Sequence, residues 1–541
     1  MNVITRKTRT VANHVNVYRA RRTRPTSNRI FRELVAQVPV VPGTSAILCE
    51  ALWDHPHHWL RVAMLRNALA PQYGRDLIGL HEADTLPHIV ETLQNLGPTN
   101  MEVVPGAVAE RHRSKADDLL SGLQTATDLL SLNIAPGYPA HFFYDGVLKA
   151  EKLGTLDPVA SHEMLRKQLA QALAYIEFYA GLFDRRDIGA VIVSHPTTVR
   201  FSTLVWAALS RAIPVFIINY RNQHVTVRKL NSLDDYAGVA EDVPTVPDRD
   251  TLSPDQRARL IDTGHRFLSA VRAGKEGEIN VTGAFDASRG GLRERHALSD
   301  AVGAPTDKPN IVVLASCWPD FPNAPGRSYL ADHVDWFERT LAIAHETSSY
   351  NWFFKAHPAE TMYGRKTTLA KLLDGRTGTN VFMWPEAATG TDVLDCADCA
   401  VTAVGSVGFE YPALGARALV ARETAYTGWG FSNYARNGDE YADMLRRAAT
   451  LPLATPTQRE DALIYIALRL TAPEETQTDG YKFPWGRLSY NLWPGLPDFI
   501  RTHRANFERE TCLMRRWIAS DNPSYSVFKN LHPDLWSQTT P

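Results

Sequence analysis

The sequence predicts an α/β protein made of two domains, each built from parallel strands that alternate with helices. Short runs of β-branched and aromatic residues recur along the chain, and amphipathic stretches with a period of about 3.6 residues separate them, which is typical of strands joined by helices. The chain has 541 residues, which exceeds the size at which one hydrophobic core keeps growing. Two large domains are therefore expected.

The first series of elements lies in the N-terminal half. The segment 188–220 has the order strand, amphipathic helix, strand, which predicts a compact β-α-β unit. Residues 221–308 are more polar and have weaker patterns, so we expect them to form the tail of the first domain and a connection. Strands are predicted over 45–52, 76–81, 188–195 and 214–220, and helices over 57–70, 84–96 and 199–211.

A second series follows, and an aromatic tail that is helical over 497–519 ends the chain. Its predicted strands are 310–316, 351–355, 379–385, 399–404 and 416–421, with helices over 329–346 and 407–415. We divide the chain into a basic N-terminal tail (1–30), a first α/β domain (31–305), a second α/β domain (306–485) and a C-terminal segment (486–541) that crosses back onto the first domain.

Composition excludes several functional classes. Apolar residues make up 44% and charged residues 22%, which is ordinary for a globular protein and argues against disorder. The 58 Lys and Arg residues balance 59 Asp and Glu residues, so no overall field attracts nucleic acid, and we expect no nucleic-acid partner.

The chain shows no run of about 18 to 20 apolar residues and no secretory signal. We therefore expect a cytoplasmic protein. The first 24 residues carry seven Lys or Arg side chains. They form either a solvated terminus or an electrostatic tether that brings the protein to the cytoplasmic face of the inner membrane.

Five cysteines are too few and too scattered for a disulfide framework, which agrees with a reducing compartment. Cys396 and Cys399 have the C-x-x-C spacing of redox or zinc sites. No second C-x-x-C and no nearby histidine pair completes four metal ligands, so structural packing is the favoured interpretation. We expect no metal site.

Ligands of open parallel sheets bind beyond the carboxyl ends of the strands, so residues that follow strands are the candidates for a site. In "VTAVGSVGFEYPALG", Gly405, Ser406 and Gly408 follow a strand and precede a helix. Glycines allow close approach to the backbone, and a helix start presents unpaired N–H groups, so this stretch predicts an anion-binding loop. It lacks both the P-loop spacing and the three-glycine dinucleotide pattern. Glu410 is either a hydrogen-bond acceptor for a ribose or sugar hydroxyl or a solvated helix carboxylate.

The run "NWFFKAHP" ends a predicted strand on Lys355, His357 and Pro358. A histidine at a strand end is either a structural side chain or part of a site. Because the strand that precedes Ser406 belongs to the same sheet, we interpret His357 and Lys355 as cations or donors that face the same anion.

Three segments together resemble a known group of enzymes. "FPNAPGRSYLADHVDWFERTL" (321–341), "NWFFKAHP" and "VGSVGFEYPALGARALVARETAYTGWGF" look like the C-terminal half of bacterial capsule and surface-polysaccharide biosynthesis glycosyltransferases, which are related to the capsule Kdo transferases. The resemblance covers about 310–436, and in the first half only "VIVSHPTTVRFSTLVWAALSRAIPVFIIN". It implies a GT-B-like fold, in which two Rossmann-like α/β domains face each other across a cleft and the second holds a nucleotide-sugar donor.

The resemblance also implies roles for individual residues. His357 and Pro358, with Lys355 before them, match the family's His-Pro element. Tyr426 matches the tyrosine of a following Tyr-x-Gly-x-Gly segment. The family's Gly-[Ser/Thr]-x-Gly-x-Glu element is matched by Gly405, Ser406, Gly408 and Glu410.

The chain also departs from the family. It has Lys-Ala-His-Pro where relatives have Lys-Pro-His-Pro, and Tyr411-Pro412 where they have small residues, which leaves the donor's identity open. GT-B relatives generally work without a metal ion, and no Asp-x-Asp stands at a strand end of the second domain. The resemblance thus implies no essential divalent ion and no cofactor other than the nucleotide-sugar substrate.

Transfer from a nucleotide sugar leaves a phosphate that gains charge in the transition state, so donors aimed at its oxygens accelerate bond breaking. His357, Lys355 and the amides around Ser406 are groups of this kind. The acceptor needs a base, or a carboxylate needs to act as nucleophile, and histidine suits the first role. We favour His195 and Asp54, although either side chain could simply cap a turn; the candidates in the first domain are Glu50, Asp54, His57, Asp145 and His195.

The function we expect is transfer of a sugar from a nucleotide-activated donor, with a CMP-sugar such as CMP-Kdo or a CMP-sialic acid as first choice, to a growing capsular or surface polysaccharide or glycolipid. Two alternatives stay open. One is a CDP-polyol glycerophosphotransferase-like polymerase, and the other is a non-catalytic GT-B scaffold protein in polysaccharide export.

Overall fold

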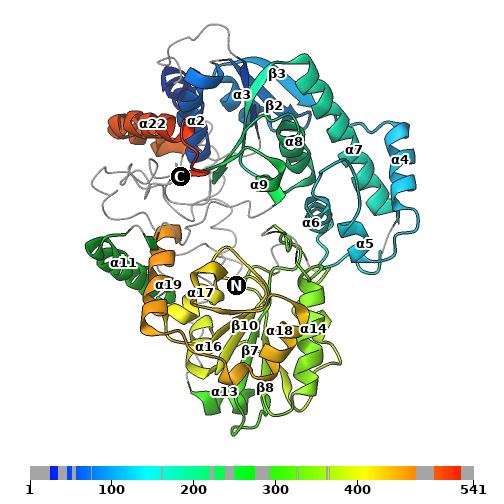
Figure 1. Ribbon diagram of the computed structural model, residues 1–541, viewed down its shortest axis with the longest axis vertical. Coiled ribbons are helices and arrows are strands. Elements are labelled where there is room, and N and C mark those ends of the chain that lie inside the picture. The colour runs from blue at the N-terminus through cyan, green and yellow to red at the C-terminus, as the bar shows by residue number, and fades with distance from the viewer. Residues whose placement is uncertain are drawn as a thin grey trace, which may run out of the picture.

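The chain forms two lobes, and each lobe contains one β-sheet (Figure 1). The computed structural model describes residues 25–34, 45–51, 56–159 except 75, 162–219, 225–237, 249–273 except 251, 292–470 except 293, 325, 327, 361–363 and 365, and 493–525. The seven basic residues among the first 24 and the side chains of Asp54 and His57 lie outside this part of the chain.

The first lobe contains a seven-stranded sheet with the order β13-β6-β5-β4-β1-β2-β3. Strands β3, β2, β1, β4 and β5 are parallel, and β6 and β13 add to the β5 edge in antiparallel orientation. The strands are β1 Ala46–Glu50, β2 Leu77–Glu82, β3 Pro98–Val104, β4 Ile188–Val193, β5 Val215–Asn219, β6 Thr226–Leu230 and β13 Ser524–Tyr525.

Helices cover both faces of this sheet, because neighbouring strand residues point to opposite sides. Leu48 packs with one cluster, while Ile47 and Cys49 pack with the other. The first cluster is covered by α4 Glu110–Leu120, α5 Ala126–Leu130, α6 Ala140–Glu151, α7 His162–Arg185 and α8 Val199–Leu209; the second by α2 Pro56–Tyr73, α3 Pro87–Gln94, α21 Leu496–Thr502 and α22 Arg504–Ile518. The predicted return of the C-terminal helix to the first domain is confirmed, since α22 packs against α2 through Met514 and Trp517.

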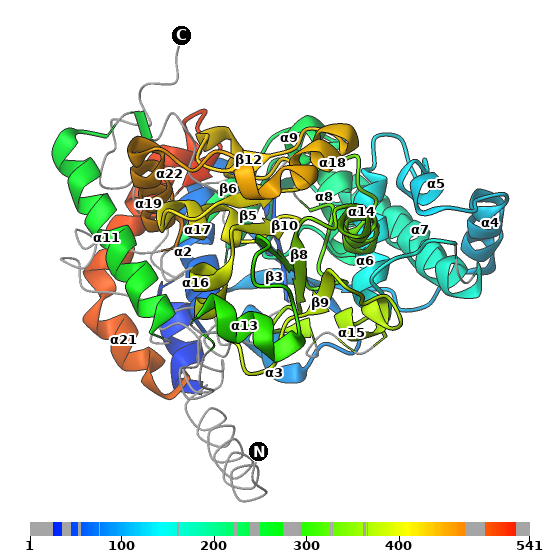
Figure 2. The ribbon, with the colours of Figure 1, turned by 90° about the horizontal axis from the view of Figure 1, so that it is seen from below.

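The second lobe contains a sheet of six parallel strands with the order β12-β11-β10-β7-β8-β9. Figure 2 shows α13 and α16 on one side of it and α14 and α18 on the other. The predicted α/β class with two Rossmann-like units is confirmed. The elements are β7 Asn310–Leu314, β8 Asn351–Lys355, β9 Val381–Met383, β10 Cys399–Thr402, β11 Ala418–Val420, β12 Asn433–Tyr434, α13 Arg295–Val302, α14 His333–Glu346, α15 Leu369–Leu373, α16 Gly390–Cys396, α17 Val407–Ala413, η4 Thr427–Trp429 and α18 Gly438–Arg446.

Part of the predicted first domain packs with the second sheet instead. Helix α11, Pro254–Arg272, lies against α19, Pro456–Leu470, and a side chain at Gly264 would overlap the backbone of Leu463. Leu260 and Leu268 of α11 share a cluster with residues of α17 and α19, and α13 packs against α16. This packing differs from the predicted boundary, which assigned residues up to 305 to the first domain.

Helix α6 of the first lobe contacts the segment that follows β7 in the second lobe. The Tyr144 hydroxyl donates to Asp332 Oδ2 (2.6 Å), and Lys149 forms an ion pair with Asp320. Just beyond the helix, the Gly154 amide donates to Thr367 Oγ1 (3.0 Å). The segments that follow β7 and β8 therefore lie against the first lobe. Within the described residues, no helix is both long and apolar enough to cross a bilayer.

Candidate functional site

The carboxyl edge of the second sheet brings two of the predicted segments side by side. His357 follows β8, Ser406 follows β10, and β7 lies between these strands. Strands in a sheet are about 4.8 Å apart, so the two strand ends are separated by roughly 10 Å. The predicted His357 and Ser406 segments thus lie on one rim.

His357 is half-buried, and its Nδ1 accepts a hydrogen bond from the Ala359 amide (3.1 Å). Burial lowers the pKa of His357, Asp320 opposes this effect, and the Lys355 charge adds to it. The imidazole is therefore neutral at neutral pH. Because Nδ1 is an acceptor, the proton is on Nε2, which makes that atom a hydrogen-bond donor.

Lys355 and Pro358 flank the histidine in different ways. Lys355 is the last residue of β8 and is half-buried, near enough to His357 to lower its pKa. Pro358 is exposed and belongs to a turn in which the Glu360 amide donates to the His357 carbonyl (3.0 Å). Pro358 therefore shapes the turn that presents the imidazole.

The loop after β10 is held by its own neighbours. The Gly405 amide donates to Thr402 Oγ1 (3.1 Å), and a Cβ at Gly405 would lie 2.7 Å from that oxygen. Ser406 is exposed and starts α17. The glycine at 405 is needed because the chain turns closely over the end of β10, and the turn leaves Ser406 facing outward.

Glu410 lies one turn into α17, and its amide donates to the Ser406 carbonyl (2.9 Å). Burial raises the pKa of the Glu410 carboxyl, and a hydrogen bond from the Ser406 side chain partly opposes this. The side chain is half-buried and faces the serine. Glu410 is thus a partner of Ser406 rather than a fully solvated carboxylate.

Tyr426 stabilises this loop from the interior of the second lobe. Its ring is 2% exposed, and its hydroxyl donates to the Gly405 carbonyl (2.7 Å). A Cβ at Gly408 would lie 2.6 Å from Tyr426 Cε2, so Gly408 provides room for the ring. The sequence predicted Tyr426 and Gly408 as donor-binding residues. In the structure both residues take part in packing that holds the loop in place, and their role in donor binding stays a prediction.

Replacement of Gly408 by alanine should destabilise the protein by about 1–3 kcal/mol, because the new methyl group overlaps the Tyr426 ring and overpacking costs energy of this order. Urea unfolding measures the loss. Tyr426→Phe removes the hydroxyl but keeps the ring, and is the matched control for the hydrogen bond to Gly405. The account is wrong if Gly408→Ala is as stable as the parent protein.

His195 is the predicted catalytic residue of the first lobe, and it follows β4. The preceding residue, Ser194, donates its amide (3.0 Å) and its hydroxyl to the buried Glu50 Oε1 at the end of β1. Thr197 Oγ1 lies 3.3 Å from His195 Nδ1. The backbone on which His195 stands is therefore fixed by an interstrand contact within the sheet.

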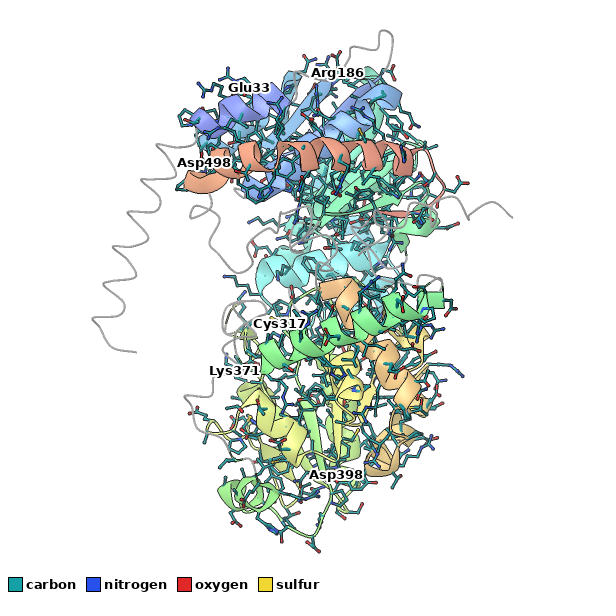
Figure 3. All side chains as sticks on the ribbon, turned by 90° about the vertical axis from the view of Figure 1, so that its left-hand side faces the viewer. Glu33, Arg186, Cys317, Lys371, Asp398 and Asp498 are labelled. Atoms are coloured by element: carbon teal, nitrogen blue, oxygen red, sulfur yellow. The ribbon has the colours of Figure 1, made fainter. Side chains whose placement is uncertain are left out.

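One dipeptide of the second lobe, Asp320–Phe321, interacts with both predicted histidines. The Phe321 ring lies 5.2 Å from the His195 ring, centroid to centroid, and Asp320 is near enough to His357 to raise its pKa. Cys317, which Figure 3 labels, lies at the level where the lobes meet and three residues before Asp320. His195 thus contacts Phe321, and His357 lies within electrostatic range of Asp320, the residue before it.

Of the other predicted acceptor-side residues, Glu50 ends a strand as expected and Asp145 does not. The sequence suggested that Asp145 ends a strand, but it lies within α6 and is fully buried. Its oxygens accept hydrogen bonds from the Asn323 amide (2.8 Å) and Nδ2 (3.0 Å). Glu50 is engaged with Ser194. Asp54 and His57 lie outside the described side chains, so Asp54 stays a prediction.

Two charged or titratable residues near this rim were missed from the sequence. His333, the first residue of α14, is 5% exposed, and burial lowers its pKa to about 3, with Arg422 and His357 nearby. Arg422 follows β11, is 5% exposed, and has its pKa lowered to about 10 by burial. The position of Arg422 just after a predicted strand was the available signal.

The cysteine pair is structural. Cys396 is 2% exposed and packs with the cluster on the α13 and α16 side, while Cys399 is 1% exposed and packs on the opposite face. Burial raises the pKa of both thiols, to about 11 and about 12. Among the described side chains, no group of three or more His, Cys, Asp or Glu is arranged to hold a metal ion.

No protein-family model and no curated protein sequence matches the chain. Solved structures that resemble it include Thermosulfurimonas dismutans KpsC, beta Kdo 2,4 transferase (16% identity, 51% of this chain and 79% of that chain, TM-score 0.32). The beta Kdo 2,7 transferase of the same KpsC also matches (12% identity, 53% and 79%, TM-score 0.31).

UDP-GlcNAc 2-epimerase from Neisseria meningitidis, bound to UDP-GlcNAc, is a third match (10% identity, 85% of this chain and 100% of that chain, TM-score 0.22). At these TM-scores the likenesses by themselves establish no activity.

Proposed function

We propose that the protein is a glycosyltransferase that moves a sugar from a nucleotide-activated donor, with a CMP-sugar such as CMP-Kdo as first choice, to a capsular or surface polysaccharide or glycolipid. One observation supports this most directly: His195 and His357, from the carboxyl edges of two different sheets, interact with the same dipeptide, Asp320–Phe321. In open α/β sheets, ligands bind at these edges.

In this proposal the second lobe binds the donor phosphate. His357 Nε2–H donates to the oxygen that gains charge as the sugar leaves, and the Lys355 ammonium adds positive charge beside it. Ser406 contributes a hydroxyl, and Glu410 accepts from a ribose or sugar hydroxyl. Burial keeps the His357 pKa low, so the imidazole acts as a neutral hydrogen-bond donor and the positive charge of the site comes from Lys355.

The first lobe supplies the acceptor side. His195 removes a proton from the attacking hydroxyl, and the acceptor lies in a cleft between the lobes. The proposed place of action is the cytoplasmic face of the inner membrane, where the basic N-terminal residues provide a peripheral tether. This assignment needs no metal ion, since the positive charge beside the leaving group comes from Lys355.

Cytidine nucleotides should raise the melting temperature more than uridine or guanosine nucleotides. A ligand at 100 times its dissociation constant stabilises the folded state by about 2.7 kcal/mol, which a thermal-shift assay detects. CMP, CDP, UDP and GDP form the test set, with cytidine as the control for base recognition without phosphate. If none of the four nucleotides stabilises the protein, the donor assignment is wrong.

Product analysis separates the alternatives. Labelled CMP-sugars and CDP-glycerol, each with a glycan acceptor, distinguish sugar transfer from polyol-phosphate transfer. Binding of a nucleotide without turnover of any donor supports the scaffold alternative, which also expects His357→Ala to leave the surface glycan of the host intact.

A further inference from the structure

Phe321 has an unusual backbone for a bulky residue. Its φ is +51°, in the left-handed region that glycine adopts easily and aromatic residues rarely adopt. Such a conformation persists only where the surrounding structure imposes it, and it is common at functional sites. The cause must therefore be found in what holds the turn.

Two buried polar side chains, one from each lobe, hold the turn that Phe321 begins. Asp145 of α6 accepts from the amide and the side chain of Asn323. Arg422, after β11, donates to the carbonyls of Pro322 (3.0 Å) and Gly326. These hydrogen bonds hold the turn at both ends. The contacts of neighbouring residues therefore impose the left-handed backbone conformation at Phe321.

The strained residue directs its ring toward the first lobe. The ring lies 5.2 Å from the His195 ring at an interplanar angle of 55°, and the Lys149 ammonium lies 5.4 Å from the ring centroid. Lys149 also pairs with Asp320, the residue before Phe321. The ring therefore lies between a cation of α6 and the predicted base.

We propose that Phe321 is a positioning residue that holds the His195 imidazole in place across the junction of the lobes, and that the clamp of Asp145 and Arg422 aims its ring. For its catalytic consequence this inference rests on the proposed role of His195. A displacement of about 1 Å in a reacting group can cost roughly 100-fold in rate, so an aromatic wall against the base is a sensitive point.

Three variants of the full-length protein separate the proposed positioning of His195 from an effect on folding. Phe321→Gly removes the ring but relieves the left-handed backbone, so the relief of strain offsets part of the lost packing and the variant should stay folded. Its kcat should fall about 10- to 100-fold with the KM for the donor unchanged. Phe321→Tyr keeps the ring and should retain nearly full activity, while Phe321→Leu should be intermediate.

A second measurement does not depend on turnover. In protein labelled with ¹³C at histidine Cε1, the signal of His195 is the one lost in His195→Gln. Phe321→Leu should shift this signal because it removes the ring current. Phe499→Leu is the matched control, since the Phe499 ring lies 4.8 Å from His503 and its loss should move the His503 signal but not that of His195.

The outcomes are distinct. An unshifted His195 signal in Phe321→Leu, or a wild-type kcat in Phe321→Gly, overturns the positioning role. A loss of kcat that only follows a fall in melting temperature also overturns it. If the parent protein transfers no sugar but the His195 signal moves as expected, the proposed function fails while the contact between Phe321 and His195 stands.

Discussion

Replacement of His357 by alanine should lower kcat about 10²- to 10³-fold while the melting temperature stays close to that of the parent protein. The expected loss is that of one hydrogen-bond donor aimed at a developing anion. Stability should change little, because within the described residues the imidazole makes a single hydrogen bond, from the Ala359 amide to Nδ1. Steady-state kinetics with the donor identified by thermal shift measures the effect.

His357→Gln is the matched variant. A glutamine amide can place an N–H close to the position of the imidazole Nε2–H, so part of the lost rate should return. The KM for the donor should rise less than kcat falls, since the interaction strengthens in the transition state. Full activity of His357→Ala would remove the imidazole from the mechanism.

Replacement of Asp145 by alanine should destabilise the protein by roughly 2–4 kcal/mol. The change leaves the buried amide of Asn323 without its acceptor and weakens the contacts of Nδ2, and each unsatisfied buried donor costs about 1–3 kcal/mol. Urea unfolding measures the loss. Asp118→Ala, on the exposed side of α4, is the control and should change stability by less than about 0.5 kcal/mol.

Asp145 should also make stability depend on pH. Burial raises its pKa from 3.8 to about 8, so between these values the folded protein keeps a proton that the unfolded chain releases. The stabilisation is complete below the unfolded value and is lost as the pH rises through the folded value. The unfolding free energy of the parent protein minus that of Asp145→Asn should therefore fall from pH 4 to pH 8. A difference that grows with pH contradicts this assignment.

Strand and helix positions of the second lobe were predictable because local pattern and tertiary environment agree there. The run before Lys355 is buried on both faces of a parallel sheet, and such strands have continuous apolar sequences. The rule that ligands bind at the carboxyl edge then identified the segments of His357 and Ser406 without knowledge of their packing.

Other features were beyond reach because they depend on contacts distant in sequence. Asp145 looked like a strand-end carboxylate, but its partner Asn323 is 178 positions away. Nothing in the sequence indicated that Gly408 also has to make room for the Tyr426 ring, which lies 18 positions further along the chain. The short strand β13 pairs with β6, which is nearly 300 residues earlier in the sequence. A strand of two residues is too short to have a pattern that predicts this pairing.

The return of α22 and β13 to the first sheet has a consequence for engineering. The second lobe is an insertion in the chain, which leaves the first lobe after α9, Leu233–Ala237, and comes back to it before α21. A deletion that ended the protein after α19 would expose the apolar face of α2 that Trp517 and Met514 now cover. Excision of the insertion, with a short linker between its ends, is the safer route to an isolated first lobe.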